Sequence, residues 1–185
     1  MVLFFGRLVP YKGAQYIIRA APLIVEKVPD CHFIVAGTSR HDRLSIDRIL
    51  SSSKIRERFT FTGYVPDEEV PELYASCDVF TFPSLWEGFG LPLAEAQAVG
   101  KPVVAFNMCA MPEVVENGRS GILVSPKDYR KLAEAIVYLL KNPDVAHKMG
   151  ENGYERVKRM FTWDLVTSKV EEAYKKAIVY HSVRC

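Results

Sequence analysis

Cysteine is scarce in this chain of 185 residues, and neither sign of charge is in marked excess. The four cysteines form no C-x-x-C pair and have no histidine at a metal-ligand interval, so a zinc site is not indicated. The formal net charge is +2 and no Lys/Arg-rich run occurs, which argues against a nucleic-acid partner. No stretch approaches the roughly 20 apolar residues of a membrane span, and the N-terminus lacks the basic start and cleavage site of a secretion signal.

These absences favour a cytoplasmic protein. In a reducing compartment, cysteines behave as small apolar side chains and seldom form disulfides. We therefore expect Cys31, Cys77 and Cys109 to be buried thiols, and Cys185 to be an exposed residue of the C-terminal tail.

Short apolar runs alternate along the chain with segments of helical periodicity. The runs show little polar alternation, which is typical of parallel strands covered on both faces; they span residues 2–6, 32–37, 58–63, 78–83, 102–106 and 121–124. The helical segments span residues 13–27, 42–53, 67–76, 91–99, 128–140, 144–160 and 163–180. The alternation predicts an α/β fold: a single doubly wound, Rossmann-like domain, with a parallel sheet of about six strands and helices on both faces.

Prolines and caps refine the expected helices. Pro22 lies inside the first helical segment and predicts a kink or a break there. Asp67 is expected to cap the N-terminus of the third segment, with Pro71 in its first turn, where a missing N–H costs little. Gly100 is expected to end the fourth segment.

Loops that follow the predicted strands contain most of the unusual residues. In doubly wound sheets ligands bind outside the carboxyl ends of the strands, so these loops share one rim. After the first strand, Gly6 is followed by Arg7 and Lys12. Arginine presents a planar fork to phosphate oxygens and lysine a compact charge, so the pair suits a diphosphate. The alternative is two solvated surface cations.

A glycine-rich turn after the fourth strand, residues 84–95, carries two acids. Free N–H groups at Gly90, Leu91 and Leu93 would form an anion site at the start of a helix. Glu87 lies just before that helix and Glu95 one turn into it, and a carboxylate can accept hydrogen bonds from two neighbouring hydroxyls. Cations for phosphate and acids for hydroxyls together indicate a sugar nucleotide. Taken singly, each acid could instead be a helix-end or solvated charge.

In their order and spacing, these motifs resemble a known family. FFGRLVPYKG, VAG, FTGYVP, PSLWEGFGLPLAEAQAVGKPVVA and NGRSGILV look like the C-terminal half of a retaining glycosyltransferase of the group-one, glycogen-synthase-like family, which has the two-domain GT-B architecture. The resemblance runs from Phe4 to about Tyr180, and its specific signature is the E-x-x-x-x-x-x-x-E pair, Glu87 and Glu95. It implies transfer of a hexose, with retention, from a nucleotide diphosphate sugar to an unknown acceptor.

The resemblance also implies roles for individual residues. Arg7 and Lys12 match the cations that grip the donor diphosphate, and Glu87 matches the acid that contacts the donor sugar; these three are the candidate catalytic residues. Glu95 matches the acid on the ribose hydroxyls. The remaining candidate donor-binding residues match backbone or loop positions around the nucleotide and sugar; they are Gly6, Gly37, Val65, Phe89, Gly90 and Leu91.

The sequence has no D-x-D pair of the kind that holds a divalent metal on a leaving diphosphate. Arg7, Lys12 and the helix start at Gly90 can supply fixed positive charge instead. We therefore expect no metal site and no cofactor, with the nucleotide sugar as co-substrate.

The resemblance covers only a C-terminal half, so the N-terminal, acceptor-binding domain is expected to be absent from residues 1–185. The chain alone should then fail to transfer sugar, because the acceptor site and domain closure are lost. Residues 163–180 form an amphipathic helix that packs toward the other domain in family members; here its apolar stripe could stay exposed or support self-association.

Three other functions remain open on the sequence alone. The chain could be half of a sugar-nucleotide epimerase, which shares the two-domain architecture but would use further acids and histidines. It could be a nucleotide-sugar binding module without chemistry. A dinucleotide-binding or receiver domain ranks last, because no G-x-G-x-x-G follows the first strand and the receiver's acidic cluster is absent.

Overall fold

A parallel β-sheet forms the centre of the molecule. The structure, a computed structural model, describes residues 1–38 and 55–182. Within them the sheet has six strands in the order β3-β2-β1-β4-β5-β6, all paired in parallel. The strands are β1 (Val2–Phe5), β2 (Phe33–Ala36), β3 (Phe59–Gly63), β4 (Val79–Phe82), β5 (Val103–Phe106) and β6 (Gly121–Val124). Each coincides with a predicted apolar run, so the predicted fold class is confirmed.

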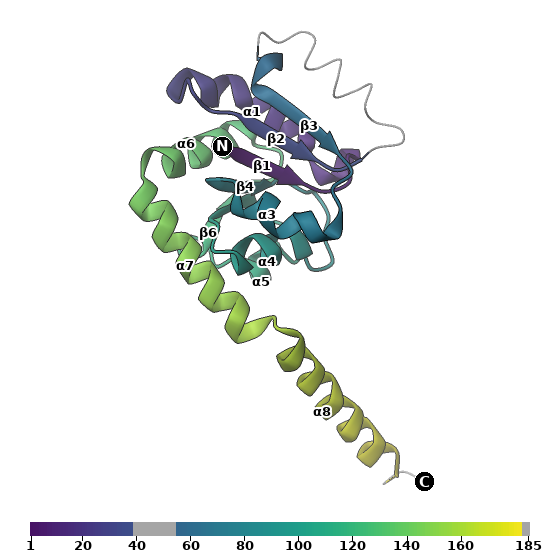
Figure 1. The fold of residues 1–185 in the computed structure, drawn as a ribbon. Helices are drawn as coiled ribbons and strands as arrows, with labels where there is room; N and C mark the ends of the chain where they lie inside the picture. The colour runs from purple at the N-terminus through teal and green to yellow at the C-terminus, as the bar shows by residue number, and fades with distance from the viewer. Residues whose placement is uncertain (39–54, 183–185) are drawn as a thin grey trace.

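Helices cover both faces of the sheet. α1 (Ala14–Lys27) packs against α6 (Tyr129–Lys141) on one face, and α3 (Val70–Ala75) and α4 (Leu91–Ala98) lie on the other (Figure 1). α5 (Met111–Val114) is a single turn, and α7 (Pro143–Met160) packs along α4. Three 3-10 turns also occur among the described residues; they are η1 (Pro10–Lys12), η2 (Arg56–Arg58) and η3 (Asp67–Glu69).

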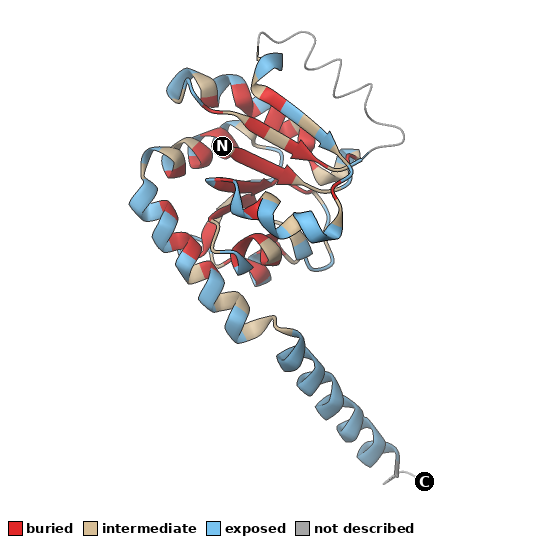
Figure 2. Cartoon of the chain, viewed as in Figure 1, coloured by how far each residue is buried: buried red, intermediate tan, exposed pale blue. Residues whose placement is uncertain are grey.

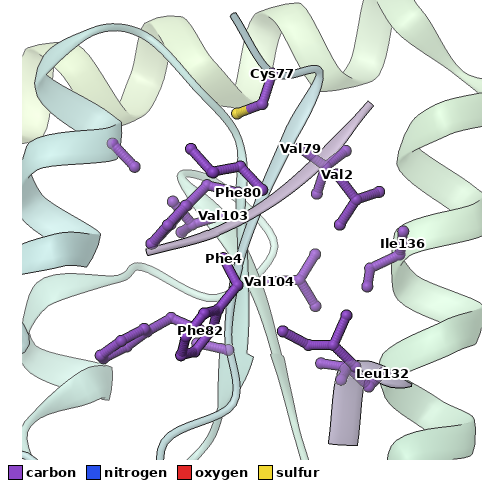
Figure 3. Packing of buried hydrophobic residues seen from close by; sticks show 14 of the residues in the cluster. Val2, Phe4, Cys77, Val79, Phe80, Phe82, Val103, Val104, Leu132 and Ile136 are labelled. Atoms are coloured by element: carbon purple, nitrogen blue, oxygen red, sulfur yellow. The ribbon is translucent and has the colours of Figure 1, made fainter. Parts of the chain in front are cut away.

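The core lies in two layers, one on each side of the strands. Phe80 and Phe82 of β4 point to one side, while Leu132 and Ile136 of α6 pack on the other (Figure 3). The Phe82 ring stacks with Phe4 at a centroid distance of 6.0 Å. All four residues of β4 are buried, which explains why its sequence shows no polar alternation.

Two local predictions differ from the structure: the break at Pro22 does not occur, and Asp67 is not a helix cap. α1 continues through Pro22, which faces solvent, because buried Ile17, Ala21 and Ile24 hold the segments on both sides of the proline against the core. Asp67 caps no helix: the chain enters from Pro66 as the η3 turn, and α3 begins only at Val70 without a side-chain cap. The helix predicted over residues 42–53 lies outside the described residues.

The prediction for the cysteines was correct for two of them. Cys31 and Cys77 are buried free thiols, whereas Cys109 is exposed. Cys109 follows β5 in a turn where its φ is 51°, which places it on the rim rather than in the core. Cys185 lies outside the described residues.

α8 (Trp163–Ser182) extends away from the rest of the molecule (Figure 1). All of its residues from 163 to 181 are exposed, including Trp163, Val170 and Tyr174 of the predicted apolar stripe. The stripe is exposed on this chain, and self-association through it remains a prediction. Among the described residues, no helix is both long and apolar enough to cross a membrane.

Candidate functional site

The candidate residues lie in loops near the point where the strand order of the sheet reverses. β1 and β4 are adjacent, and from them the chain order runs outward both ways, through β2 and β3 on one side and β5 and β6 on the other. The chain continues from β1 to α1 on one face of the sheet and from β4 to α4 on the other face. In doubly wound sheets, ligands bind at such a switch point.

Backbone contacts lock the β1 loop to the β4 loop. The Tyr11 carbonyl accepts hydrogen bonds from the Leu85 N–H at 2.6 Å and from Ser84 Oγ at 3.1 Å. Gly13 has a φ of 88°, and a Cβ there would lie 1.9 Å from the carbonyl oxygen of Pro83. Only glycine fits this crossing, so the two loops hold a fixed relative position.

An ion pair joins the two loops through their side chains. Lys12 Nζ donates to Glu87 Oε1 at 2.6 Å, and the side chains are only 15% and 10% exposed. The ammonium also lies 5.4 Å from the centre of the Phe82 ring. Two candidates separated by 75 positions in the chain therefore meet directly, in surroundings that strengthen their attraction.

Arg7 lies on the same loop as Lys12 but is exposed. Its Nη2 donates to the Tyr11 hydroxyl at 2.8 Å, which fixes the guanidinium beside the loop. One N–H fork of an arginine remains available after such a single bond. Tyr11 therefore contacts the β4 loop through its carbonyl and Arg7 through its hydroxyl, a role that no sequence motif indicated.

The start of α4 provides backbone donors. Gly90 precedes the helix with a φ of 91°, and Pro92 occupies the first turn. The N–H groups of Gly90 and Leu91 have no hydrogen-bond partner within the described part of the chain. The Leu93 N–H, in contrast, donates to the Gly90 carbonyl at 2.9 Å, so the prediction of a free amide at Leu93 was wrong. The tight turn at Gly90 brings that carbonyl within reach of Leu93.

Phe89 lies half exposed in the same glycine-rich turn. Its ring packs edge-on against Phe161, at the end of α7, with the centroids 5.3 Å apart. Phe161 thereby supports the turn from a distant part of the sequence.

Glu95 is half buried on α4, and its carboxylate is held by a neighbouring helix. Its Oε2 accepts a hydrogen bond of 2.8 Å from the hydroxyl of Tyr74 on α3. Burial, together with the adjacent Glu95 carboxylate, raises the pKa of Tyr74. Tyr74 looked like an ordinary core residue in the sequence, because nothing there shows that its hydroxyl reaches an acid on another helix.

The strand ends beyond β1 are joined by backbone bonds. The Gly6 N–H donates to the Ala36 carbonyl at 3.0 Å, and the Gly37 N–H to the Gly63 carbonyl at 2.8 Å. A Cβ on Gly37 would lie 2.0 Å from the Gly6 carbonyl oxygen, at a φ of 125°. Val65 is buried just after β3. These candidate positions share the rim with the ion pair but contribute mainly backbone surface.

The arrangement therefore combines cations, helix amides and two carboxylates on one rim. No group of three or more His, Cys, Asp or Glu side chains that could hold a metal ion occurs among residues 1–38 and 55–182. The topology defines a doubly wound α/β domain that offers ligand contacts beyond the carboxyl ends of β1 and β4.

Comparison with known proteins assigns this domain to a family. The chain matches the family of group 1 glycosyl transferases over residues 1–156, and it belongs to that family. It is 31% identical over 190 residues to a D-inositol 3-phosphate glycosyltransferase of Corynebacterium diphtheriae, covering 100% of this chain and 44% of that protein. It is also 34% identical to an MMP alpha-(1->4)-mannosyltransferase of Mycolicibacterium hassiacum, covering 92% of this chain and 41% of the relative. The chain thus spans less than half the length of these relatives.

Solved structures agree with the assignment. Anabaena Alr3699/HepE in complex with UDP superposes with a TM-score of 0.87 at 26% identity, over 95% of this chain and 48% of that one. The C-terminal domain of a group 1 family glycosyl transferase (LpcC) from Francisella tularensis superposes with a TM-score of 0.78 at 28% identity, over 88% of this chain and 85% of that domain.

Proposed function

We propose that this chain is the nucleotide-sugar donor-binding half of a retaining glycosyltransferase that moves a hexose to an acceptor. The observation that carries the proposal is the Lys12–Glu87 ion pair, a cation and an acid brought together at the switch point of the sheet. Family membership supports it, and so does the UDP bound to the similar Anabaena protein.

In this proposal, Arg7 and Lys12 bind the diphosphate. Glu87 occupies one of the three N–H donors of the Lys12 ammonium, so others remain for phosphate oxygens. The N–H groups of Gly90 and Leu91 add donors from the positive end of α4. As the sugar–phosphate bond breaks, negative charge grows on the leaving diphosphate, and these preorganised groups stabilise it.

The acids contact hydroxyls. Glu87 lies beside Lys12 and would accept hydrogen bonds from the donor sugar, while Glu95, one turn into α4, would accept those of the ribose. Phe89 would contact the sugar from the glycine-rich turn. The backbone at Gly6, Gly37 and Val65 would face the nucleotide. Because backbone contacts do not select one base, the proposal does not name the base of the donor.

Because fixed cations and helix amides take the place of a metal on the diphosphate, we propose metal-independent transfer. Transfer by the whole enzyme should persist in EDTA, as measured by product formation from a radiolabelled nucleotide sugar. An activity that EDTA abolishes and Mg²⁺ or Mn²⁺ restores would contradict this part of the proposal.

We further propose that the chain corresponds to the C-terminal domain of a two-domain enzyme, with the acceptor site on the other domain. The LpcC match supports this, because that structure is described as a C-terminal domain and the chain covers 85% of it. Residues 1–185 alone should then bind donor without transferring sugar. Transfer by this polypeptide alone would contradict it.

A calorimetric titration with UDP-, GDP- and ADP-sugars tests donor binding directly. At least one should bind, and Arg7→Ala and Glu95→Ala should each weaken binding by about tenfold, as expected for loss of a charge-assisted hydrogen bond. Arg130→Ala and Glu134→Ala, exposed residues of α6, are the matched controls and should bind normally. Failure of every nucleotide sugar to bind, or equal losses in the α6 variants, would refute the proposal.

A further inference from the structure

Tyr74 lies next to the candidate site without being part of its sequence motifs. It is 1% exposed, and its ring packs edge-on against Phe5 at 5.7 Å and Phe80 at 5.2 Å between centroids. These two contacts fix the ring between β1 and β4, the strands of the switch point. The direction of the hydroxyl is therefore set by the core of the domain.

The hydroxyl uses that fixed direction to hold Glu95. Tyr74 Oη donates to Glu95 Oε2 at 2.8 Å. A glutamate side chain has several rotatable bonds, and binding a ligand with it costs the entropy of ordering them. With Oε2 occupied by a donor from the core, the carboxylate is ordered in advance and Oε1 remains as an acceptor.

The tyrosine keeps this role at every working pH. Burial is the largest cause of its raised pKa, and the charge of Glu95 adds to it. The hydroxyl therefore stays protonated and can only donate to the carboxylate.

We propose that Tyr74 is a positioning residue for nucleotide recognition: it orients the Glu95 carboxylate so that Oε1 accepts from the ribose hydroxyls of the donor. This inference rests on the proposed function, because it assumes that Glu95 faces a ribose. The competing explanation is that the hydrogen bond only fastens α3 to α4. Ribose discrimination separates the two, since a fastener would affect every nucleotide equally.

The test uses whichever of UDP, GDP and ADP binds the wild-type chain most tightly, together with its 2′,3′-dideoxy analogue. Calorimetry compares the wild type with Tyr74→Phe and with Tyr16→Phe, a matched control that removes a hydroxyl from a buried tyrosine on α1 packed edge-on against Phe106. We expect Tyr74→Phe to weaken binding of the nucleotide by roughly tenfold while barely changing binding of the analogue. Tyr16→Phe should retain the wild-type preference for the ribose.

A double-mutant cycle with Glu95→Ala tests whether Tyr74 acts through the acid. In the Glu95→Ala background, Tyr74→Phe should cause no further loss of affinity. Thermal unfolding of each variant shows whether it is folded at the titration temperature. If Tyr74→Phe is not folded there, all titrations are repeated at a lower temperature at which its unfolding curve shows the folded state.

The outcomes distinguish the two levels of the proposal. If the wild type prefers the ribose and Tyr74→Phe shows the same preference, the role of Tyr74 is refuted and the proposed function stands. An equal loss for nucleotide and analogue also refutes it, in favour of a fastener. If no nucleotide binds the wild type, the proposed function itself fails.

Discussion

The helices of the α/β body and α8 differ in burial, although apolar residues at helical spacing predict both. Helices α1 and α6 bury their apolar faces against the sheet, whereas all residues of α8 from 163 to 181 are exposed (Figure 2). The apolar stripe of α8 runs through Val166, Val170 and Tyr174 without a covering surface in the described chain. An amphipathic sequence therefore indicates a face suited to packing, but it does not say what that face packs against.

The ion pairs of the two regions also differ in their exposure to solvent. The body is held by buried contacts and by the Lys12–Glu87 pair, which is largely shielded from water. α8 has pairs between neighbouring turns, such as Glu172–Lys176 at 2.6 Å, with side chains 64% and 75% exposed. Water screens the exposed pairs, whereas removing one partner of a shielded pair leaves the other charge buried and unpaired, so breaking the shielded pair costs more unfolding free energy.

The largest expected effect comes from filling the space where the two site loops cross. Gly13→Ala would place a Cβ 1.9 Å from the Pro83 carbonyl oxygen at a φ of 88°. We expect it to lower the free energy of unfolding by more than about 3 kcal/mol, because strain and overlap add. Gly100→Ala is the control, with a similar φ of 71° but no atom within 4 Å, and should cost about 1 kcal/mol. Chemical denaturation measures both, and equal losses would contradict the account.

The second effect compares the two ion pairs. Lys12→Met removes the partner of the shielded Glu87 carboxylate, and we expect a loss of about 2 kcal/mol in unfolding free energy. Lys176→Met removes an exposed helix pair and should cost less than about 0.5 kcal/mol. Urea titrations of the two variants give the comparison. A loss at Lys176 as large as that at Lys12 would mean that α8 is integrated into the body.

The third effect is a loss of body stability in alkali. Burial raises the pKa of Cys77 from 9.0 to about 12 and that of Cys31 from 9.0 to about 11. The folded state therefore keeps these protons longer than the unfolded state, so stability is fully present below pH 9 and falls as pH rises toward 11–12. By pH 10, ionisation of each thiol in the unfolded state should have lowered the free energy of unfolding by about 1 kcal/mol.

Single alanine variants isolate this alkaline effect. Cys77→Ala should show a shallower fall of the unfolding free energy between pH 9 and 10 than the wild type, while exposed Cys109→Ala should match the wild type. Unchanged slopes in Cys77→Ala would show that the buried thiol does not contribute.

The smallest expected effect is the removal of α8. A chain ending at Thr162 should have the same free energy of unfolding as the full chain, within about 0.5 kcal/mol, and therefore nearly the same midpoint, because the side chains of α8 are exposed. Differential scanning calorimetry measures this. A large drop in the midpoint would contradict the separation of the two regions.

The sequence predicted the parts of the fold that depend on local pattern. All six strands and the end of α4 before Gly100 follow from apolar runs and a helix stop, which are local signals. The continuation of α1 through Pro22 could not be predicted in this way, since it depends on packing between α1 and α6. Cys109 was misjudged because a residue beside a buried strand can still lie on the rim.

The candidate site was predictable in composition but not in its connections. Parallel topology explains why Lys12 and Glu87 lie on one rim, so their convergence could be expected. The bond from Tyr74 to Glu95 depends on how α3 packs beside α4, which no motif records. The hydrogen bond from the Leu93 N–H to the Gly90 carbonyl depends on the left-handed conformation of Gly90 before α4.

A crystal structure of this chain with UDP would show whether the nucleotide binds at the switch point. We expect the diphosphate against Arg7, Lys12 and the N-terminus of α4, with the ribose hydroxyls on Glu95. A nucleotide bound at the amino ends of the strands, or bound at the switch point without contact to Lys12 or Glu95, would contradict this expectation.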